Sequence, residues 1–551
     1  MRYLIKKLLK KFKIKDYAAT NWKQIISEHK KEFELIKKKA NGKKILIATS
    51  TGGQLFCSHF ESLLAFALTY YGARVEILLC DKVLPACMMA TSKFIDEESF
   101  SKNGPSKVCN SCFDSGKFAF DGLGLKVNYY SQFITDKDIK DLNETIDNLT
   151  YDQLSDYKED DINIGEHSLA GALRYYAVGD LLDQKYKDNI LRSYVKAGTI
   201  TKKVMNNFFI KNSDFEIIIL NHAIYIPQGI INSVSKKYGK KIVSYVSGYR
   251  KNSFIFSHDD TYHFTMVDEP TSEWEDLNLN SIRDQRIMNY LNSRKFGTDD
   301  WTYYFDNPKF EIKDSLIAKG VDLGKPIIVM ATNIIWDANL IYKDNIFLNQ
   351  MNWIYETIDY FKSRNNLQLI IRAHPGEINY DRISNQRVKD ELIKKYKILP
   401  KNIFIIGPEE NLSTYPLVYL SNTLLIYASK VGMEFPPFGT NVVVAGESYV
   451  KNKGITIDPK TKKEYFEILD KIPLKIKKDV SKITRAKKYA YHFFFKKTIV
   501  PNSLKEEPTK WPIFTIKSNV LDNLKKGNDK PLKSICDSII NYKPFAYDEV
   551  I

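Results

Sequence analysis

The chain has 551 residues, of which 44% are hydrophobic and 13% aromatic. At roughly 100–200 residues per domain, this length predicts two or three domains. The apolar content is sufficient for a core in each, which excludes a disordered chain and a small disulfide scaffold. Lys and Arg number 82 against 66 Asp and Glu, a formal net charge of +16. This excess favours anionic partners, namely nucleic acid, phospholipid headgroups or nucleotide phosphates, without choosing among them.

Residues 1–15 predict a basic amphipathic helix. Apolar residues recur there at helical spacing, and seven Lys or Arg residues fill the other face. This pattern is typical of attachment to an anionic membrane surface, and the alternative is a helix packed on its own protein. We find no apolar run long enough to span a bilayer and no secretory signal. We therefore expect a cytoplasmic protein that is peripheral on the inner face of the cell membrane.

Beyond Gly42, short β-branched segments alternate with longer amphipathic stretches, which is typical of parallel sheets covered by helices. Two series of strands are predicted, at 44–49, 74–80, 126–130, 216–220, 241–246 and 262–267, and at 326–331, 367–372, 402–406, 423–427 and 441–445. Two Rossmann-like doubly wound units explain this better than one large sheet. We expect an α/β fold with a helical N-terminus (1–40), two such domains (41–310 and 311–485) and a basic, aromatic C-terminal extension (486–551).

A glycine turn, Thr49-Ser50-Thr51-Gly52-Gly53, directly follows the first predicted strand. Ligands of open α/β sheets bind at the carboxyl ends of strands, so Gly52 and Gly53 are candidates for donor binding. The turn matches neither a dinucleotide fingerprint nor a P-loop, and a plain tight turn is the alternative. His59, in the first turns of the next helix, is a candidate general base, unless it is a structural histidine.

Polar side chains elsewhere in the first half could reach the same ligand. Glu166 is a candidate for catalysis, and His167 beside it could bind acceptor hydroxyls. His222 follows the strand at 216–220, and His258 precedes the one predicted at 262–267. Both are further candidates for acceptor binding, and hydrogen-bonded structure is the alternative for each of the four.

The sharpest local signal is Ile370-Ile371-Arg372-Ala373-His374-Pro375-Gly376-Glu377. An apolar strand ends in a cationic residue, and Pro375 then takes the chain out of regular structure. Arg372 and His374 are therefore held at the carboxyl end of a strand, where they can neutralise a leaving phosphate. We expect Arg372, His374, Pro375 and Glu377 to bind the donor, with His374 also catalytic.

A second group of small and polar residues, Ser429-Lys430-Val431-Gly432-Met433-Glu434, follows the strand predicted at 423–427. Ser429 and the amides of a helix N-terminus suit phosphate, and Lys430 adds positive charge. Glu434 suits the hydroxyl groups of a ribose. An ordinary capped helix is the alternative for the whole group.

The order strand, His-Pro, strand, Ser, Gly, Glu, then Gly439-Thr440-Asn441, resembles the donor half of GT-B glycosyltransferases, specifically capsule and surface polysaccharide biosynthesis proteins. His-Pro and Ser are similar to nucleotide-phosphate motifs of bacterial sialyltransferases and Kdo transferases. The resemblance spans about residues 44–500 and implies two Rossmann-like domains facing across a cleft. It also implies an inverting transfer without a catalytic metal, from a CMP-, UDP-, GDP- or CDP-linked sugar to a glycan or lipid-linked acceptor. The acidic motif that carries the base in sialyltransferases has no match, so the base stays open.

Four of the six cysteines have spacings that suggest a structural zinc site. Cys109 and Cys112 have zinc-knuckle spacing, and Cys80 with Cys87 could complete a tetrahedral thiolate site. The alternative is free thiols in a core, because disulfides are rare in a reducing compartment.

Two functions of another class compete with the transferase. A non-catalytic, membrane-associated assembly protein of the same polysaccharide pathway would keep the fold and the basic ends. A nucleic-acid-binding protein would explain the charge of +16. No DNA- or RNA-binding motif occurs, however, and the lysines concentrate at the chain ends and on helix faces. We therefore expect no nucleic-acid partner.

Overall fold

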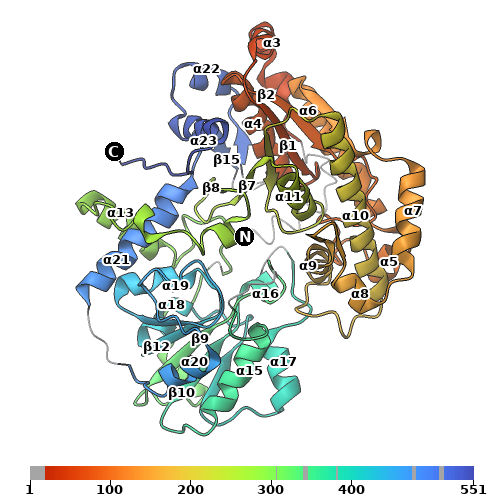
Figure 1. The fold of residues 1–551 in the computed structure, drawn as a ribbon. Helices are drawn as coiled ribbons and strands as arrows, with labels where there is room; N and C mark the ends of the chain where they lie inside the picture. Colours follow the sequence, from red (N-terminus) through yellow and green to blue (C-terminus); the bar gives the residue numbers. More distant parts are fainter. Residues whose placement is uncertain are drawn as a thin grey trace.

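A computed structural model describes residues 19–305, 307–338, 345–379, 382–474, 479–507 and 514–550 of the chain. The amphipathic helix predicted at 1–15 lies outside these residues. None of the helices in the described ranges is both long enough and apolar enough to cross a bilayer. Figure 1 shows two sheet-containing units, with the chain passing from the first to the second and its C-terminal segment, in blue, running back beside the first.

The first unit contains a seven-stranded sheet with the order β14-β8-β7-β6-β1-β2-β3. The five strands from β7 to β3 are parallel, whereas β8 and β14 are antiparallel to their neighbours. The strands are β1 (Lys44–Ser50), β2 (Arg74–Leu79), β3 (Lys126–Tyr129), β6 (Ile217–Asn221), β7 (Lys241–Ser247), β8 (Phe254–His258) and β14 (Thr498–Ile499), and a separate hairpin joins β4 (Lys158–Glu159) to β5 (Ile162–Asn163).

Helices cover both faces of this sheet because alternate residues of its strands point to opposite sides. Leu46 and Ala48 of β1 belong to one apolar cluster, and Ile45 and Ile47 to another. The first cluster includes residues of α5 (Glu97–Asn103), α7 (Asp136–Asp147), α8 (Tyr151–Ser155), α9 (Ile164–Tyr176), α10 (Lys187–Lys211) and α11 (Gln228–Lys237). The second includes residues of α2 (Trp22–Ile25), α3 (Lys30–Lys39), α4 (Leu55–Tyr70), α6 (Ser106–Leu123), α22 (Val520–Lys525) and α23 (Lys530–Asn541).

The second unit contains a five-stranded, fully parallel sheet with the order β11-β10-β9-β12-β13. Its strands are β9 (Ile327–Ala331), β10 (Gln368–Arg372), β11 (Ile403–Ile406), β12 (Thr423–Ile426) and β13 (Asn441–Val444). Its helices are α14 (Lys313–Ala318), α15 (Gln350–Phe361), α16 (Gly376–Asn379), α17 (Val388–Tyr396), α18 (Thr414–Leu420), α19 (Val431–Glu434) and α20 (Lys462–Leu469). The predicted α/β class with two Rossmann-like units is therefore confirmed.

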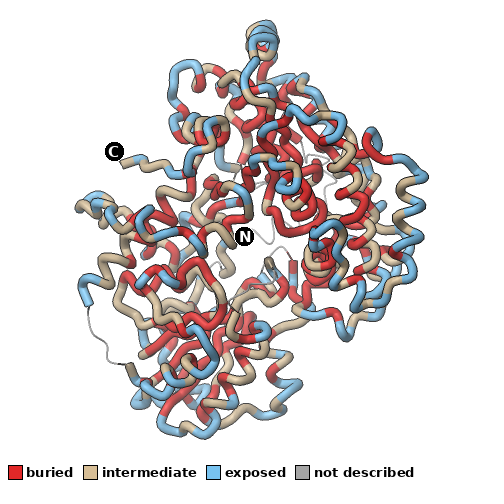
Figure 2. Tube along the Cα trace, viewed as in Figure 1, coloured by how far each residue is buried: buried red, intermediate tan, exposed pale blue. Residues whose placement is uncertain are grey.

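The strand predicted at 262–267 is wrong. Those residues begin the short helix α12 (Tyr262–Thr265), and the strand is instead β8, immediately before it. From α12 through α13 (Ser281–Ser293), the apolar side chains pack in the same cluster as one face of the second sheet. Figure 2 shows buried segments, in red, running through both units.

The C-terminal extension contributes to the sheet of the first unit. Helix α21 (Val480–Tyr491) continues into a π-helical turn (His492–Lys497), and β14 then pairs with β8. A hairpin of β15 (Leu504–Glu506) and β16 (Phe514–Ile516) precedes α22 and α23, and α23 packs on α4. The described elements from β14 to α23 therefore belong to the first unit.

Candidate functional site

Loops from the carboxyl ends of strands in both sheets meet at one place, hereafter the junction. The loop after β6 contributes Tyr225, whose hydroxyl donates to Asp337 Oδ1 at 3.2 Å, in the loop after β9. The backbone N–H of Ala338 donates to the same hydroxyl at 2.9 Å. Arg174 of α9 lies 4.9 Å over the Tyr225 ring. Strand ends are where α/β sheets bind ligands, so the junction is the candidate site.

His222, directly after β6, is the histidine that the first unit places at the junction. Its backbone has φ of 67°, a left-handed conformation that costs free energy and persists only where the surroundings enforce it. Burial lowers the pKa of its imidazole to about 4, so the ring is neutral at pH 7. Its Nδ1 atom is buried without a hydrogen-bond partner among the described residues. The ring stacks 5.8 Å from His263, whose pKa burial lowers to about 3.

His374 is the corresponding residue of the second unit, at the end of β10. The backbone N–H of Gly376 donates to its Nδ1 at 3.0 Å, so in the neutral ring the proton must sit on Nε2. Burial, reinforced by the charges of Lys430 and Arg372, lowers the pKa of His374 to about 3. The Tyr304 ring meets it edge-on at 5.1 Å. His374 is thus a neutral imidazole with a fixed donor.

Asp337 is the residue of the junction that our sequence analysis missed. Its charge acts on both imidazoles, and in each case it favours the protonated ring. The strand-end rule that selected His222 and His374 applies equally to the loop after β9, where this carboxylate lies. Asp337 therefore connects the two histidines electrostatically across the junction.

Arg372 has different partners from the predicted phosphate. Its side chain is 2% exposed, and its guanidinium donates to the carbonyl oxygens of Gly407 at 2.6 Å, Leu412 at 3.0 Å and Glu410 at 3.2 Å. These contacts hold the loop between β11 and α18. The structure therefore gives Arg372 a structural role.

Glu377 is also buried inside the second unit, where it has an internal partner. It is 0% exposed, and its carboxylate accepts the backbone N–H of Val388 at 3.2 Å. Burial raises the pKa of this carboxyl to about 7. Pro375 precedes the short helix α16, in which Glu377 lies, and sets its start.

Glu434 lies in a buried network of charges, hereafter the Glu434 network, and not beside an open ribose site. Its side chain is 2% exposed and lies 3.1 Å from Arg294, while the Tyr415 hydroxyl donates to it at 2.7 Å. Arg294 also pairs with Asp300 at 2.8 Å. Burial alone would raise the pKa of Glu434, but Arg294, Lys430 and Tyr415 together lower it to about 2. Glu434 thus has internal partners, and its predicted contact with a ribose stays a prediction.

Lys430 and Ser429 remain at the edge of the junction. The Lys430 ammonium lies 5.0 Å from the centre of the Tyr249 ring in the first unit and 3.5 Å from Glu434. Burial, with the charge of Arg294, lowers the pKa of Lys430. Ser429 accepts the backbone N–H of Val431 at 3.4 Å, at the start of α19. Lys430 is thus a positive charge whose field acts on His374.

The two glycines after β1 are explained by packing. A Cβ atom on Gly52 would lie 2.5 Å from Gly116 Cα, and one on Gly53 would lie 2.7 Å from Cys112 Cα. Both glycines therefore allow α6 to approach the turn closely. His59 is 4% exposed within α4, and its ring lies 6.3 Å from that of Phe514 in the C-terminal hairpin. These positions favour scaffold roles over donor binding and base catalysis.

Two of the predicted acceptor contacts also have internal partners. His167 Nδ1 lies 2.6 Å from the carbonyl oxygen of Ile224 and so supports the loop that carries His222, while Glu166 lies beside His167. His258 Nε2 lies 2.7 Å from the carbonyl oxygen of Lys543, and its ring packs on Tyr542. Because β8 is antiparallel, His258 pairs with the start of β7, at the opposite edge of the sheet from the junction.

The four cysteines of the predicted zinc site line one small cavity at the end of β1 and β2. Burial raises the pKa of Cys80 to about 12 and that of Cys112 to about 11, and it also raises the pKa of Cys87. Within the described ranges, no group of three or more His, Cys, Asp or Glu side chains is arranged ready-made for a metal ion.

No protein-family model matches the chain, and no curated protein matches it. Among solved structures, it is similar to KpsC of Thermosulfurimonas dismutans, a β-Kdo 2,4 transferase, with 10% identity and a TM-score of 0.35 over 56% of this chain and 87% of that one. UDP-GlcNAc 2-epimerase of Neisseria meningitidis has 11% identity and a TM-score of 0.24, over 80% and 94%. Trehalose 6-phosphate synthase of Burkholderia multivorans has 9% identity and a TM-score of 0.30, over 91% and 98%. At these values the likenesses carry no argument about the activity of this chain.

Proposed function

We propose that the chain is a glycosyltransferase that moves a sugar from a nucleotide-activated donor to a growing surface glycan, a capsule or a related polysaccharide. The observation that carries the proposal is a neutral imidazole just beyond the carboxyl end of a strand in each sheet, His222 after β6 and His374 after β10, with the charge of Asp337 acting on both. One can accept a proton while the other donates a hydrogen bond, which is the pair of tasks that glycosyl transfer requires. The motif order in the second half, which resembles GT-B enzymes, supports the same reading.

On the donor side, His374 stabilises the phosphate that leaves. Its Nε2–H is a fixed donor because Gly376 occupies Nδ1. A phosphate oxygen gains negative charge as the glycosidic bond breaks, so this hydrogen bond strengthens in the transition state. Lys430 adds positive charge close by. Protein side chains thereby supply the charge compensation, and we infer a transfer that needs no catalytic metal.

On the acceptor side, His222 is the proposed general base. The acceptor oxygen bonds to the anomeric carbon as the bond from that carbon to the donor phosphate oxygen breaks. The hydroxyl proton passes to the His222 ring, and the bonding electron pair leaves with the nucleotide phosphate. A single displacement of this kind inverts the anomeric centre. The pKa of about 4 keeps His222 in its basic form at neutral pH.

Nucleotide binding and turnover test the proposal separately. We would measure the melting temperature with CMP, UDP, GDP and CDP and with their sugar conjugates, because a ligand of the native state raises it. We expect one nucleotide to stabilise the wild-type chain and its sugar conjugate to be slowly hydrolysed. His222→Gln should keep the stabilisation and lose turnover. The matched control is His29→Gln, because His29 is a half-buried histidine on a surface turn, beside Glu32.

Two results would contradict the proposal in different ways. Stabilisation by a nucleotide with no hydrolysis or transfer would favour a non-catalytic assembly protein. If none of the four nucleotides or their sugar conjugates raised the melting temperature, the proposed donor site would be contradicted. Membrane attachment through residues 1–15 belongs to the same proposal, since it would bring the junction to a lipid-linked acceptor.

A further inference from the structure

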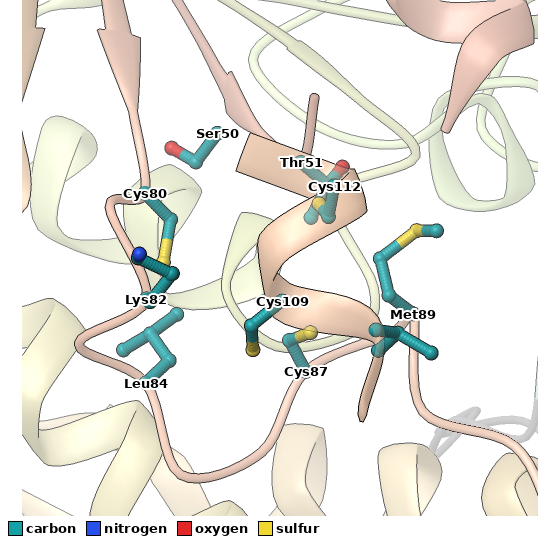
Figure 3. A pocket seen from close by; sticks show the side chains of 10 residues that line it. Ser50, Thr51, Cys80, Lys82, Leu84, Cys87, Met89, Cys109 and Cys112 are labelled. Carbon is teal, nitrogen blue, oxygen red and sulfur yellow. The ribbon is translucent and has the colours of Figure 1, made fainter. Parts of the chain in front are cut away.

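Four of the six cysteines surround one cavity, hereafter the thiol cavity. Figure 3 shows their side chains around it, two from the loop after β2 and two from α6: Cys80, Cys87, Cys109 and Cys112. The other two, Cys57 and Cys536, are buried in the apolar cluster on the other face of the first sheet. The fold has therefore gathered four thiols from two segments, the loop after β2 and α6, around one cavity.

Backbone N–H groups are directed at the sulfurs of the thiol cavity. The N–H of Gly53 donates to Cys112 Sγ at 3.1 Å. The backbone of Lys82 and Leu84 donates to Cys80, and that of Met89 donates to Cys87. A hydrogen bond to sulfur stabilises a thiolate far more than a neutral thiol. These hydrogen bonds lower the pKa of the thiols, but burial has the larger effect and raises it, so the thiols stay protonated unless a cation binds them.

Negative sulfur in this cavity needs more positive charge than the protein supplies. Lys82 is the one charged side chain among the described residues that line it. Uncompensated thiolates in a buried site would cost far more than one lysine offsets. A soft divalent cation meets the need, because four thiolates are the usual ligands of structural zinc.

We propose that the four cysteines of the thiol cavity bind one zinc ion as thiolates. Cys109 and Cys112 are one helical turn apart and so share a face of α6. The sulfurs are not yet arranged around a common point. Binding of the ion would therefore require their side chains to rotate towards a common point.

The zinc ion would brace the loop that supports the junction. The Cys87 carbonyl accepts the Tyr194 hydroxyl at 3.3 Å. Its neighbour Met88 donates its N–H to the Ile226 carbonyl at 2.9 Å and accepts from Arg174 at 3.0 Å. A metal fixed to Cys87 therefore restrains both the loop that carries His222 and the arginine over Tyr225. Its role is positional, without direct contact with substrate.

Metal analysis of the full chain tests the proposal. We would purify the protein without a metal-chelating tag or resin and measure zinc and iron by mass spectrometry. We expect about one zinc per chain, released as the thiols of the cavity react with an organomercurial. Replacement by Co²⁺ should give the absorption of a tetrahedral thiolate centre. Cys87→Ser should lose zinc and melt at a lower temperature, whereas the control Cys536→Ser should keep its zinc.

Measurements on the wild-type chain decide the question even if Cys87→Ser fails to fold. A chain without zinc, whose cavity thiols react with no release of metal, would overturn the proposal. Iron with acid-labile sulfide would also overturn it, since that result would identify a cluster in place of a zinc ion. Zinc retained by Cys87→Ser would place the metal elsewhere.

Discussion

Replacing Glu434 by Gln separates an internal role of this carboxylate from a role in ligand binding. The substitution keeps the size and the hydrogen-bonding ability of the side chain and removes its charge. In the Glu434 network, that charge compensates Arg294 at 3.1 Å and Lys430 at 3.5 Å, and both carboxylate and guanidinium are nearly inaccessible to water. Breaking such a buried pair costs about 3–5 kcal/mol, because the remaining charge stays buried.

The lower end of this range applies to Glu434→Gln. Arg294 keeps its second partner, Asp300, at 2.8 Å, so it is not left without compensation. We therefore expect a loss of about 3 kcal/mol in the free energy of unfolding. With a urea dependence of about 3 kcal/mol per molar, the midpoint of the transition falls by about 1 M. Nucleotide affinity, measured on the folded protein, should change little.

A surface carboxylate provides the control. Glu467 lies 3.8 Å from Lys463, and both side chains are exposed, 54% and 87% respectively. Exposed pairs contribute about 0–1 kcal/mol, so Glu467→Gln should unfold close to the wild-type midpoint. If Glu434→Gln unfolded at the wild-type urea concentration but bound nucleotide more weakly, the carboxylate would be a ligand of the donor. The internal role argued here would then be refuted.

Three further predictions concern the junction and the N-terminus. His374→Ala should lower kcat about 10²–10³-fold by removing a fixed donor to the leaving phosphate, and turnover within tenfold of wild type would exclude that role. The pKa values of about 3 for His263 and His374, against about 6.5 in the unfolded chain, mean that the unfolded state binds more protons below pH 6.5. Stability should therefore fall as the pH drops from 6.5 towards 4, by about 2 kcal/mol per histidine at pH 5; equal urea midpoints at pH 7 and pH 5 would contradict this. Deleting residues 1–15 should reduce binding to anionic vesicles, most clearly at low salt, and leave donor hydrolysis unchanged; undiminished vesicle binding would show that this segment is not the attachment site.

Most of the sheet architecture could be predicted because buried parallel strands leave a strong local signal. All five strands of the second sheet lie within one residue of their predicted bounds, since each is a short apolar run between polar segments. Phe254–His258 was missed because its apolar run is only three residues long before Ser257 and His258, and because it lies near the side of the sheet, next to the two-residue strand β14. Pairing with residues 498–499 is a long-range contact that no local pattern contains.

The candidate site was only partly predictable, for a related physical reason. The strand-end rule located His222 and His374, because it depends on topology alone. The same rule placed Arg372 at a strand end but could not show its partners. Carbonyl groups at 407–412 fold over the guanidinium and satisfy it. Whether a charged side chain binds a ligand or its own protein is decided by tertiary contacts.

The charged side chains near the junction have internal partners, whereas its histidine rings are neutral. This difference bears on how the proposed enzyme could bind its donor, react and release the product. Arg372, Arg294 and Glu434 are fully charged groups, yet each is satisfied by internal partners of the protein. The imidazoles at the junction are neutral, so they bind a ground-state phosphate more weakly than an arginine would. A neutral donor still responds as charge develops on the leaving oxygen, and only such differential binding accelerates a reaction. Permanent charge therefore stabilises the scaffold, while the neutral donor His374 is suited to act on the transition state and then release the nucleotide.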